Sequence, residues 1–394
     1  MLFSLLKKVS FKGKIDIIDC KGKIHSFGQS TPYVKIKLQN KSVERKIFFN
    51  PALFVGEAYM SKELIIEEGT IEDFIKIITA SYEGVLSTHW LHRYSDSIST
   101  MFRWLQQLNY PLKSKKNVAH HYDLNEELYR LFLDKDMQYS CGYFYNDNIS
   151  LDQSQIDKKN HIIKKLKIEK NMSVLDIGCG WGGLALQIAK ETGAKVKGIT
   201  LSENQLNTAK KRAEEQGLAD KVEFVLQDYR QEQHQYDRIV SIGMFEHVGV
   251  KHFSEFFSKT IHLLNESGIF LLHTIGQKGK PSATDPWIRK YIFPGGYIPS
   301  LSEILQVCEK QNINITDIEI LRLHYAQTLK HWYSNFLKNK NSIIKMFDER
   351  FFRMWEYYLL SSQYSFQNLG NVVFQIQISK KINNLPLTRD YMYN

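Results

Sequence analysis

Cysteine is scarce in this sequence. The 394 residues include only four cysteines, and no two of them stand at the close spacing of a metal site or a redox pair. They are Cys20, Cys141, Cys179 and Cys308. We therefore expect a chain without a metal site, in the reduced state that is typical of cytoplasmic proteins.

Long apolar runs, repeats and low-complexity tracts are also lacking. No run approaches the ~20 residues that a membrane-spanning helix needs. The opening "MLFSLLKKVS" carries its lysines after the apolar residues, which is the reverse of a secretory signal, and no cleavage site follows. With 43% hydrophobic and 24% charged residues, the composition is typical of a globular protein with one large domain and a smaller one.

Acidic residues are few at the start of the chain. Residues 1–50 hold eleven Lys and Arg against three Asp and Glu, and Lys113, Lys115 and Lys116 form a second basic cluster. No nucleic-acid-binding motif is visible, so we expect no nucleic acid partner. Two interpretations remain open, namely a solvated basic surface and a surface that binds anionic lipid head groups.

The first part of the chain predicts a small α+β domain. The runs "KIDIID", "YVKIKL" and "ERKIFF" alternate as strands do, with Gly and Asn between them. Residues 71–84 and 85–108 follow with helical spacing. Residues 109–117 are polar and include a proline, which indicates a linker. We therefore place an N-terminal domain at 1–110, for membrane docking or for dimerisation, before a larger catalytic domain at 111–394.

From residue 118 onward, strand and helix patterns alternate. The runs "SVLDIG", "KVKGIT", "VEFVLQ", "DRIVSI", "GIFLLHT" and "NVVFQIQIS" predict strands, and helical stretches follow the first two. Such alternation predicts an α/β domain with a doubly wound, mostly parallel sheet. After "DRIVSI", Gly243 breaks the strand, and Glu246 and His247 follow at once. Because unpaired charges are expensive to bury, this position indicates a site that uses a carboxylate.

The stretch "VLDIGCGWGG" (174–183) is a strand that ends in a glycine-rich turn and opens a helix. Gly178 and Gly180 allow backbone amides to approach a ligand closely. Gly183 completes a G-x-G-x-x-G pattern, so the spacing alone leaves a dinucleotide such as NAD open. The acidic residue that binds the ribose of a dinucleotide, ~20 residues further on, is missing.

The second strand ends in "GITLSENQ" (198–205), which places Thr200, Ser202 and Gln205 where the ribose carboxylate would stand. Asp176 lies before the first glycine of the turn instead. An aspartate within the first strand, followed by G-x-G, resembles the S-adenosylmethionine-dependent methyltransferases.

The whole set of motifs resembles a more specific family. The stretches "HYDLNEELYRLFLDKDMQYSCGYF" (121–144), "QDYR", "DRIVSIGMFEHVG", "FLLHTIG" and "DPWIRKYIFPGG" occur in this order, with the glycine turn, over about 118–380. They are similar to the cyclopropane-fatty-acyl-phospholipid synthases and the related mycolic acid cyclopropane synthases. This resemblance implies a seven-stranded, Rossmann-like methyltransferase sheet. The first 110 residues resemble, more loosely, the extra domain of the bacterial synthases.

The resemblance also implies a reaction. A methyl group passes from S-adenosylmethionine to the cis double bond of an unsaturated phospholipid acyl chain, and loss of a proton to bound bicarbonate closes a cyclopropane ring. The bicarbonate site would comprise Cys141 and Ile275 through backbone groups, and Glu246, His273 and Tyr325 through side chains. Two alternatives remain: a methyltransferase that leaves a methyl branch or a methyl ether, and a catalytically silent lipid-binding homologue.

The cofactor site follows from the same resemblance. In this fold the adenine lies between the ends of the second and third strands, where Asp228 would accept a hydrogen bond from its amino group and Tyr229 would flank the ring. Tyr139 and Ser140 would close over the cofactor. The expected set is Tyr139, Ser140, Asp176, Gly178, Gly180, Trp181, Gly182, Thr200, Leu201, Ser202, Gln205, Asp228 and Tyr229.

Three stretches bear on the lipid substrate. Residues 285–300 are aromatic and rich in turns, as the lid or wall of an acyl-chain tunnel would be. Residues 346–360 predict a helix with an apolar face, either plain core or tunnel wall. Ser362 stands where members of the family often have a cysteine, so a role of that cysteine does not apply here. The substrate and the basic N-terminal segment together imply peripheral association with the inner face of a membrane.

Overall fold

The computed structural model describes residues 1–81 and 126–393, which form two compact units. The first unit contains the described residues of Met1–Arg103, together with Ser282–Pro294 and Leu329–Asn371. The second contains the described residues of Trp104–Pro281, together with Gly295–Thr328 and Val372–Asn394. Four expectations lie outside the described residues: the helix at 85–108, the linker at 109–117, the boundary at residue 110 and the lysine cluster around Lys115. No helix among the described residues is long and apolar enough to cross a membrane.

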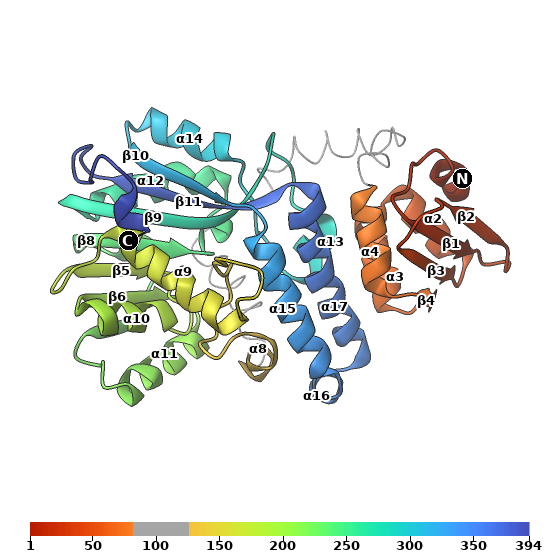
Figure 1. Ribbon diagram of the computed structural model, residues 1–394, viewed down its shortest axis with the longest axis horizontal. Helices are drawn as coiled ribbons and strands as arrows, with labels where there is room; N and C mark the ends of the chain where they lie inside the picture. Colours follow the sequence, from red (N-terminus) through yellow and green to blue (C-terminus); the bar gives the residue numbers. More distant parts are fainter. Residues whose placement is uncertain (82–125, 394) are drawn as a thin grey trace. The chain divides into compact units, whose positions relative to one another are not determined.

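The second unit is built on a seven-stranded sheet with the order β10-β11-β9-β8-β5-β6-β7 (Figure 1). Its strands are β5 (Ser173–Ile177), β6 (Lys195–Thr200), β7 (Val222–Leu226), β8 (Tyr236–Ile242), β9 (Leu264–Gln277), β10 (Asn314–Leu321) and β11 (Asn371–Ser379). The pairs from β7 to β9 are parallel, whereas β10 is antiparallel to β11. The predicted doubly wound, mostly parallel sheet is confirmed, and β10 adds a strand that its mixed polar sequence did not indicate.

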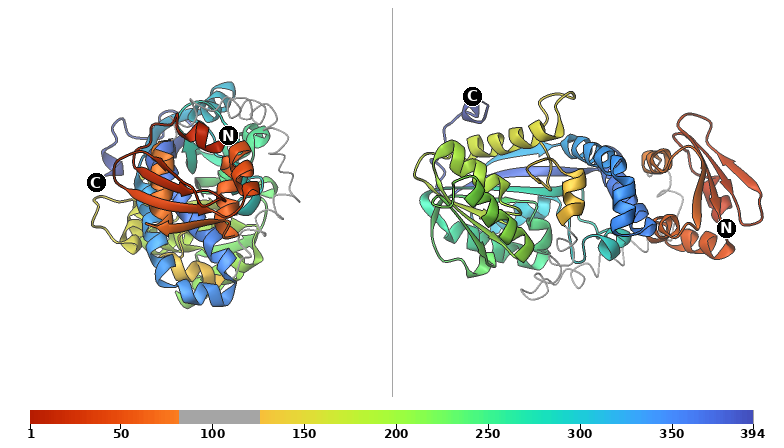
Figure 2. Two further views of the ribbon diagram at one scale, coloured as in Figure 1. Left: turned by 90° about the vertical axis from the view of Figure 1, so that its right-hand side faces the viewer. Right: turned by 90° about the horizontal axis from the view of Figure 1, so that it is seen from below.

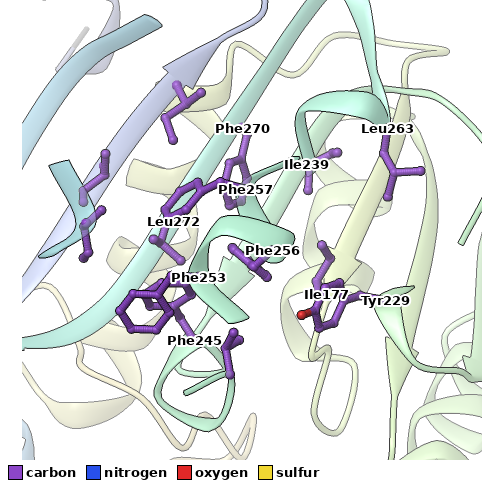
Figure 3. Packing of buried hydrophobic residues seen from close by; sticks show 14 of the residues in the cluster. Ile177, Tyr229, Ile239, Phe245, Phe253, Phe256, Phe257, Leu263, Phe270 and Leu272 are labelled. Atoms are coloured by element: carbon purple, nitrogen blue, oxygen red, sulfur yellow. The ribbon is translucent and has the colours of Figure 1, made fainter. Parts of the chain in front are cut away.

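Helices cover both faces of this sheet, and we name the faces after them. The α9 face is covered by α9 (Leu151–Leu166), α10 (Gly183–Thr192) and α11 (Glu203–Glu215), and the α12 face by α12 (Phe253–His262) and α14 (Leu301–Lys310). Strand residues alternate between the two cores, as the pleat requires. Ile269 and Leu271 of β9 belong to the core of the α9 face, whereas Phe270 and Leu272 belong to that of the α12 face (Figure 3).

The first unit contains a smaller sheet with the order β2-β1-β3-β4, drawn in red in Figure 2. Its elements are α1 (Leu2–Leu6), β1 (Lys14–Ile18), β2 (Ile24–Phe27), β3 (Tyr33–Leu38), α2 (Lys41–Phe49), α3 (Pro51–Met60), β4 (Leu64–Glu68) and α4 (Ile71–Ala80). The strands predicted at "KIDIID" and "YVKIKL" are confirmed. The strand predicted at "ERKIFF" is wrong, because this run lies in α2. There Asn40 accepts a hydrogen bond from the backbone N–H of Val43, which caps the helix, and Val43 and Ile47 are buried one turn apart.

Later segments of the chain also pack into the first unit. They include α13 (Pro286–Tyr291), α16 (Lys340–Met346) and α17 (Glu349–Tyr364). Leu360 and Tyr364 of α17 join the core of the small sheet, and the hydroxyl of Tyr59 donates to Glu356 over 2.5 Å. The apolar helix predicted at 346–360 is therefore observed, and part of its buried surface contacts the N-terminal segment.

The remaining elements are short or lie between these layers. They are α8 (Glu126–Phe132), α15 (His324–Lys338), the 3₁₀ turns η1 (Tyr229–Gln231), η2 (Phe245–His247), η3 (Val250–His252) and η5 (Asp390–Met392), and the π-helical turn η4 (Ser365–Leu369). Of these, η1 and η2 follow the carboxyl ends of β7 and β8, the edge of the sheet at which ligands bind in folds of this kind.

Candidate active site

The glycine turn after β5 requires glycine for two separate reasons. Gly178 and Gly180 have positive φ angles of 84° and 55°, which L side chains rarely adopt. A Cβ atom on Gly178 would also lie 2.9 Å from the Cβ of Met244, whereas one on Gly180 would meet nothing within 4 Å. The turn therefore keeps its backbone exposed toward the end of β8, at the start of α10, where N–H groups are available to a ligand.

A cavity opens at this edge of the sheet and holds about 1150 Å³ of space, including its open mouth. Most of the predicted cofactor residues line it: Tyr139, Ser140, Asp176, Gly178, Gly180, Trp181, Thr200, Leu201, Gln205, Asp228 and Tyr229. Gly182 and Ser202 do not. A Cβ on Gly182 would meet the ring of Phe224, and Ser202 caps α11 through the backbone N–H of Gln205.

Two pairs of polar side chains in the cavity lining are already joined by hydrogen bonds within the protein. The hydroxyl of Thr200 donates to Oε1 of Gln205 over 2.8 Å. Both carboxylate oxygens of Asp228 accept hydrogen bonds from the guanidinium of Arg230, at 2.8 and 2.6 Å. Arg230 also lines the cavity, and the sequence did not single it out. An adenine amino group would therefore share the Asp228 carboxylate with Arg230.

Asp176 differs from these residues because part of its carboxylate is unpaired. The residue is 2% exposed, and its Oδ2 has no hydrogen-bond partner among the described residues. Burial raises the pKa of Asp176 to about 7. A buried acceptor left in this state is costly unless a ligand donates to it, so Asp176 is the clearest polar anchor in the cavity.

The segment Met137–Ser140, which forms one wall of the cavity, is held by α9. Lys158 is fully buried, and its Nζ donates to Oε1 of Gln138 and to Oγ of Ser140, each over 2.8 Å. The side-chain amide of Gln155 donates to the carbonyl oxygen of Ser140 over 2.9 Å. Burial lowers the pKa of Lys158. The buried polar side chains of α9 therefore fix the position of the segment Met137–Ser140.

The next residues of this segment are held by the first turns of α15. The backbone N–H of Gly142 donates to Oγ1 of Thr328 over 2.9 Å, and that of Phe144 donates to Nδ1 of His324 over 2.9 Å. Tyr325 lies in the same turns. Cys141 is completely buried, and burial raises the pKa of its thiol. A buried thiol of raised pKa is a poor nucleophile, which agrees with a positioning role.

Glu246 follows β8 in the η2 turn and contacts β9. Its Oε1 accepts a hydrogen bond of 2.6 Å from the backbone N–H of Ile275, while its Oε2 has no partner among the described residues. Burial raises the pKa of Glu246 to about 7. His273 lies two residues before Ile275 on β9. Burial, assisted by the charge of Lys158, lowers the pKa of His273 to about 3, so its imidazole is neutral.

The five predicted catalytic residues thus fall into two groups. The neighbours of Cys141 bond to the turns of α15 that contain Tyr325, and Glu246 bonds to the backbone of Ile275, two residues after His273 on β9. None of the five belongs to the cavity lining in the described part of the chain. Each group adjoins the cavity through a sequence neighbour, Ser140 for the first group and His247 for the second. Their catalytic roles stay predictions.

Sequence reasoning missed several lining residues and the main supporting cation. The missed lining residues include Met137, Gln138, Gln227, Arg230, Met244 and Val248, whereas His247, singled out beside Glu246, is among the lining residues. Most of them directly flank predicted residues at strand ends, so extending each motif by a residue or two would have found them. Lys158 had no such signal. Ser362 lies on α17 in the first unit, where its carbonyl oxygen accepts from the hydroxyl of Ser365 over 2.7 Å.

Known proteins share both the sequence and the fold of this chain. A family model described as mycolic acid cyclopropane synthetase matches residues 111–376, and one described as a domain of unknown function matches residues 2–89. The cyclopropane-fatty-acyl-phospholipid synthase of Escherichia coli (strain K12) is 37% identical over 353 residues, which cover 89% of this chain and 88% of that protein. A probable fatty acid methyltransferase of Pseudomonas putida is 38% identical over 288 residues, 70% of this chain and 73% of that protein.

A solved structure extends the comparison to three dimensions. The structure of mycolic acid cyclopropane synthase CmaA1, complexed with SAH and CTAB, superposes with a TM-score of 0.64 at 32% identity. It covers 67% of this chain and 98% of that one. This chain therefore belongs to the mycolic acid cyclopropane synthetase family and is an enzyme of the S-adenosylmethionine-dependent methyltransferase class.

Proposed function

We propose that this enzyme converts a cis double bond in an unsaturated phospholipid acyl chain into a cyclopropane ring, with S-adenosylmethionine as the methylene donor and bound bicarbonate as the base. The observation that carries the proposal is the buried carboxylate of Glu246. Its Oε2 is unpartnered among the described residues, and its neighbour His247 lines the cavity that gathers the predicted cofactor residues. The Escherichia coli relative carries the name of this activity.

The residues of the cavity fit S-adenosylmethionine. Asp176 offers an unpaired buried oxygen to a hydroxyl or amino group of the cofactor, and the Gly178 turn leaves room for close backbone approach. The cofactor, when bound, supplies an electrophilic methyl group on a cationic sulfonium. The positive charge favours the ionised form of Asp176, so binding would bring its raised pKa back down. The CmaA1 structure was solved with SAH, the product of methyl transfer.

The residues predicted for the bicarbonate site fit an oxygen-rich anion. Two adjacent anions repel each other unless they share a proton, and the raised pKa of Glu246 allows its Oε2 to hold that proton. Neutral His273 and the Tyr325 hydroxyl can add hydrogen bonds without competing for the charge. Bicarbonate, when bound, would supply a base that accepts the proton lost from the new methyl group.

The chemistry explains why a carboxylate lies here in place of a stronger nucleophile. The alkene is a poor nucleophile, so the protein must hold the double bond in line with the methyl group. Methyl transfer leaves a carbocation on the acyl chain, which a nearby anion stabilises. A unit charge pair at ~4 Å and an effective dielectric constant of ~20 is worth about 4 kcal/mol. That corresponds to about three orders of magnitude in rate.

Two other functions remain distinguishable. Methyl transfer without ring closure would give a branched chain or a methyl ether, and the Pseudomonas putida relative is named a probable fatty acid methyltransferase. The grouping of Glu246, His273 and Ile275 favours ring closure, because such a site serves proton removal. A silent lipid-binding protein would need neither Gly178 nor Glu246.

The basic N-terminal segment supports docking on anionic lipid surfaces inside the cell. Its eleven basic residues outnumber its acidic ones by eight, and each contributes about 1 kcal/mol near an anionic surface. Charge reversal at Lys7, Lys8, Lys12 and Lys14 should reduce co-sedimentation with anionic vesicles, mainly at low salt. Unchanged binding would leave support of the core, or formation of a homodimer, as the role of this segment.

Lipid analysis tests the proposed reaction directly. Lipids from cells that express the chain should gain one CH₂ group and lose a double bond by mass spectrometry, and NMR should show a ring and no branch. Glu246→Gln should lower turnover by about 100-fold or more, the effect of losing one preorganised group at a charged transition state. Its affinity for S-adenosylmethionine should stay close to that of the wild type. Full activity of this variant in bicarbonate-depleted buffer would reject the site.

A further inference from the structure

A buried glutamine lies directly behind His273. Gln375 stands in the middle of β11, the strand next to β9, and its Nε2 lies 3.1 Å from Nδ1 of His273. Both side chains are buried, with exposures of 0% for Gln375 and 2% for His273. Phe374 and Ile376 belong to the core of the α12 face, so Gln375 points to the α9 face, as His273 does.

The amide of Gln375 needs an explanation, because β11 is otherwise a strand in which apolar side chains would pack well. Burying an amide that lacks partners costs roughly 1–3 kcal/mol. The Oε1 of Gln375 has no hydrogen-bond partner among the described residues, so the contact with His273 is what the amide provides. A residue that only filled space could be leucine or methionine.

The direction of this hydrogen bond sets the protonation of the imidazole. In the orientation that the structure assigns to the amide, its NH₂ group faces the ring and only donates, so Nδ1 of His273 accepts and carries no proton. Lys158, Lys165 and His161 on α9 disfavour a second proton on the ring, and Glu319 on β10 opposes them. The ring is therefore neutral, and its single proton lies on Nε2.

We propose that Gln375 is a positioning residue that fixes His273 as the neutral Nε2–H tautomer, so that Nε2 donates a hydrogen bond to an oxyanion held beside Glu246. The identity of this anion as bicarbonate rests on the proposed function, whereas the tautomer does not. The opposite tautomer would turn a lone pair toward the anion and repel it. One oxygen of the anion must stay free to accept a proton from the substrate. Hydrogen-bond donors such as Nε2–H of His273 therefore have to bind its other oxygens.

Two variants and one control test the tautomer in the full-length protein. Gln375→Met removes the donor, and Gln375→Glu replaces it with an acceptor of the same shape. Gln377→Met is the control, because Gln377 is equally buried on the same face of β11 but bonds to the carbonyl oxygen of Lys165 and the hydroxyl of Tyr391. Nitrogen NMR of ¹⁵N-histidine-labelled protein reads the tautomer of His273, with its signal assigned by loss in His273→Asn.

We expect the wild type and Gln377→Met to show the Nε2–H form, Gln375→Met a mixture, and Gln375→Glu a proton on Nδ1. Binding of S-adenosylmethionine, measured by calorimetry, confirms that each variant is folded. The bicarbonate concentration needed for half-maximal activity should rise about tenfold in Gln375→Met, the effect of one weakened hydrogen bond. It should not change in Gln377→Met.

The pH profile of Gln375→Glu separates this role from a merely structural one. The new carboxylate raises the pKa of His273, so at low pH both ring nitrogens carry protons and Nε2 still donates. As the pH rises through that pKa the ring keeps only its Nδ1 proton, and activity should fall along a limb that the wild type lacks. A wild-type tautomer in both Gln375 variants would overturn the inference. A wild type that needs no bicarbonate would instead overturn the proposed function, while the NMR result still decides the tautomer.

Discussion

The cores on the two faces of the seven-stranded sheet differ in the polar groups that they bury. The core of the α12 face is apolar and rich in aromatic side chains, among them the fully buried Phe245, Phe256 and Phe257 (Figure 3). The α9 face buries polar groups next to its apolar residues, including Lys158 and Gln375, each at 0% exposure. Burial of phenylalanine stabilises the fold, whereas burial of a lysine does so only if its partners compensate for lost hydration.

The partners on the α9 face show what these polar groups provide. Lys158 bonds to Gln138 and Ser140 at the cavity, and Gln375 contacts His273 on β9. The core of the α12 face also contacts the site, because the backbone N–H of Tyr297 donates to the carbonyl oxygen of Glu246 and Tyr229 lines the cavity. Both faces therefore have an apolar core that stabilises the second unit, and the α9 face also buries polar groups that fix positions at the site.

The largest predicted effect comes from the apolar face. Phe257→Ala should lower the free energy of unfolding of the second unit by about 3–5 kcal/mol, because it removes a completely buried ring. Urea-induced unfolding measures this change. The affinity of the folded fraction for S-adenosylmethionine should stay within about twofold of wild type, since this ring lies outside the cavity lining.

A substitution at an exposed apolar residue is the control for the effect of burial. Ile156 is an apolar residue of α9 that is 39% exposed, and Ile156→Ala should change stability by less than about 0.5 kcal/mol. Equal destabilisation by the two substitutions would contradict the attribution of the loss to burial of the Phe257 ring.

The second prediction concerns the glycine turn after β5, which lines the cavity. Gly178→Val should weaken binding of S-adenosylmethionine by about 100-fold or more, equivalent to ~2.7 kcal/mol. Gly217→Val is the control, because Gly217 has a similar φ of 65° but open space around a Cβ atom and no place in the cavity lining. Calorimetry should show near wild-type affinity for the control. Similar losses in both variants would mean that backbone strain alone explains the effect.

Sequence patterns predicted the layers of the fold well, because apolar runs of strand length alternate clearly with helical spacing. The strands β5 to β9 and β11 all stand where such runs occur. The alternating run "ERKIFF" predicted a strand, but it lies in α2, where Asn40 caps the start of the helix. The packing of α13 and α17 with the N-terminal segment depends on contacts far apart in the chain, such as Tyr59 with Glu356, and local patterns do not encode them.

At the site, motifs predicted the residues at strand ends but not the groups that support them. Glu246 and Ile275 meet because β8 and β9 pair in a particular register, which the family resemblance supplied and spacing alone did not. The sequence of α9, "LDQSQIDKKNHIIKKL", reads as a solvent-exposed helix. Burial of Lys158 and Lys165 in it becomes visible only when their partners on other elements are in place.

The smallest predicted effect is a pH dependence of the unfolding free energy that arises from Asp176. The pKa of Asp176 is raised from 3.8 to about 7 by burial, so the folded state binds a proton that the unfolded state has already released at neutral pH. For a raised pKa, the stabilisation is fully present below the unfolded value and is lost as the pH rises through the folded value. Between pH 6 and 8 this amounts to about 1 kcal/mol for a single group.

Asp176→Asn should remove this contribution, so the unfolding free energy of the ligand-free variant should fall less between pH 6 and 8 than that of the wild type. Urea unfolding at pH 6, 7 and 8 measures the difference. Asp220→Asn is the control, because Asp220 is exposed in the turn before β7 and should leave the slope unchanged. Saturating S-adenosylmethionine should flatten the wild-type slope as well, since the cationic cofactor favours the ionised carboxylate in the folded state. If neither Asp176→Asn nor the cofactor alters the pH dependence of the unfolding free energy, another group titrates in this range. Glu246, whose pKa is also raised to about 7, is then the expected group, and Glu246→Gln should remove the pH dependence.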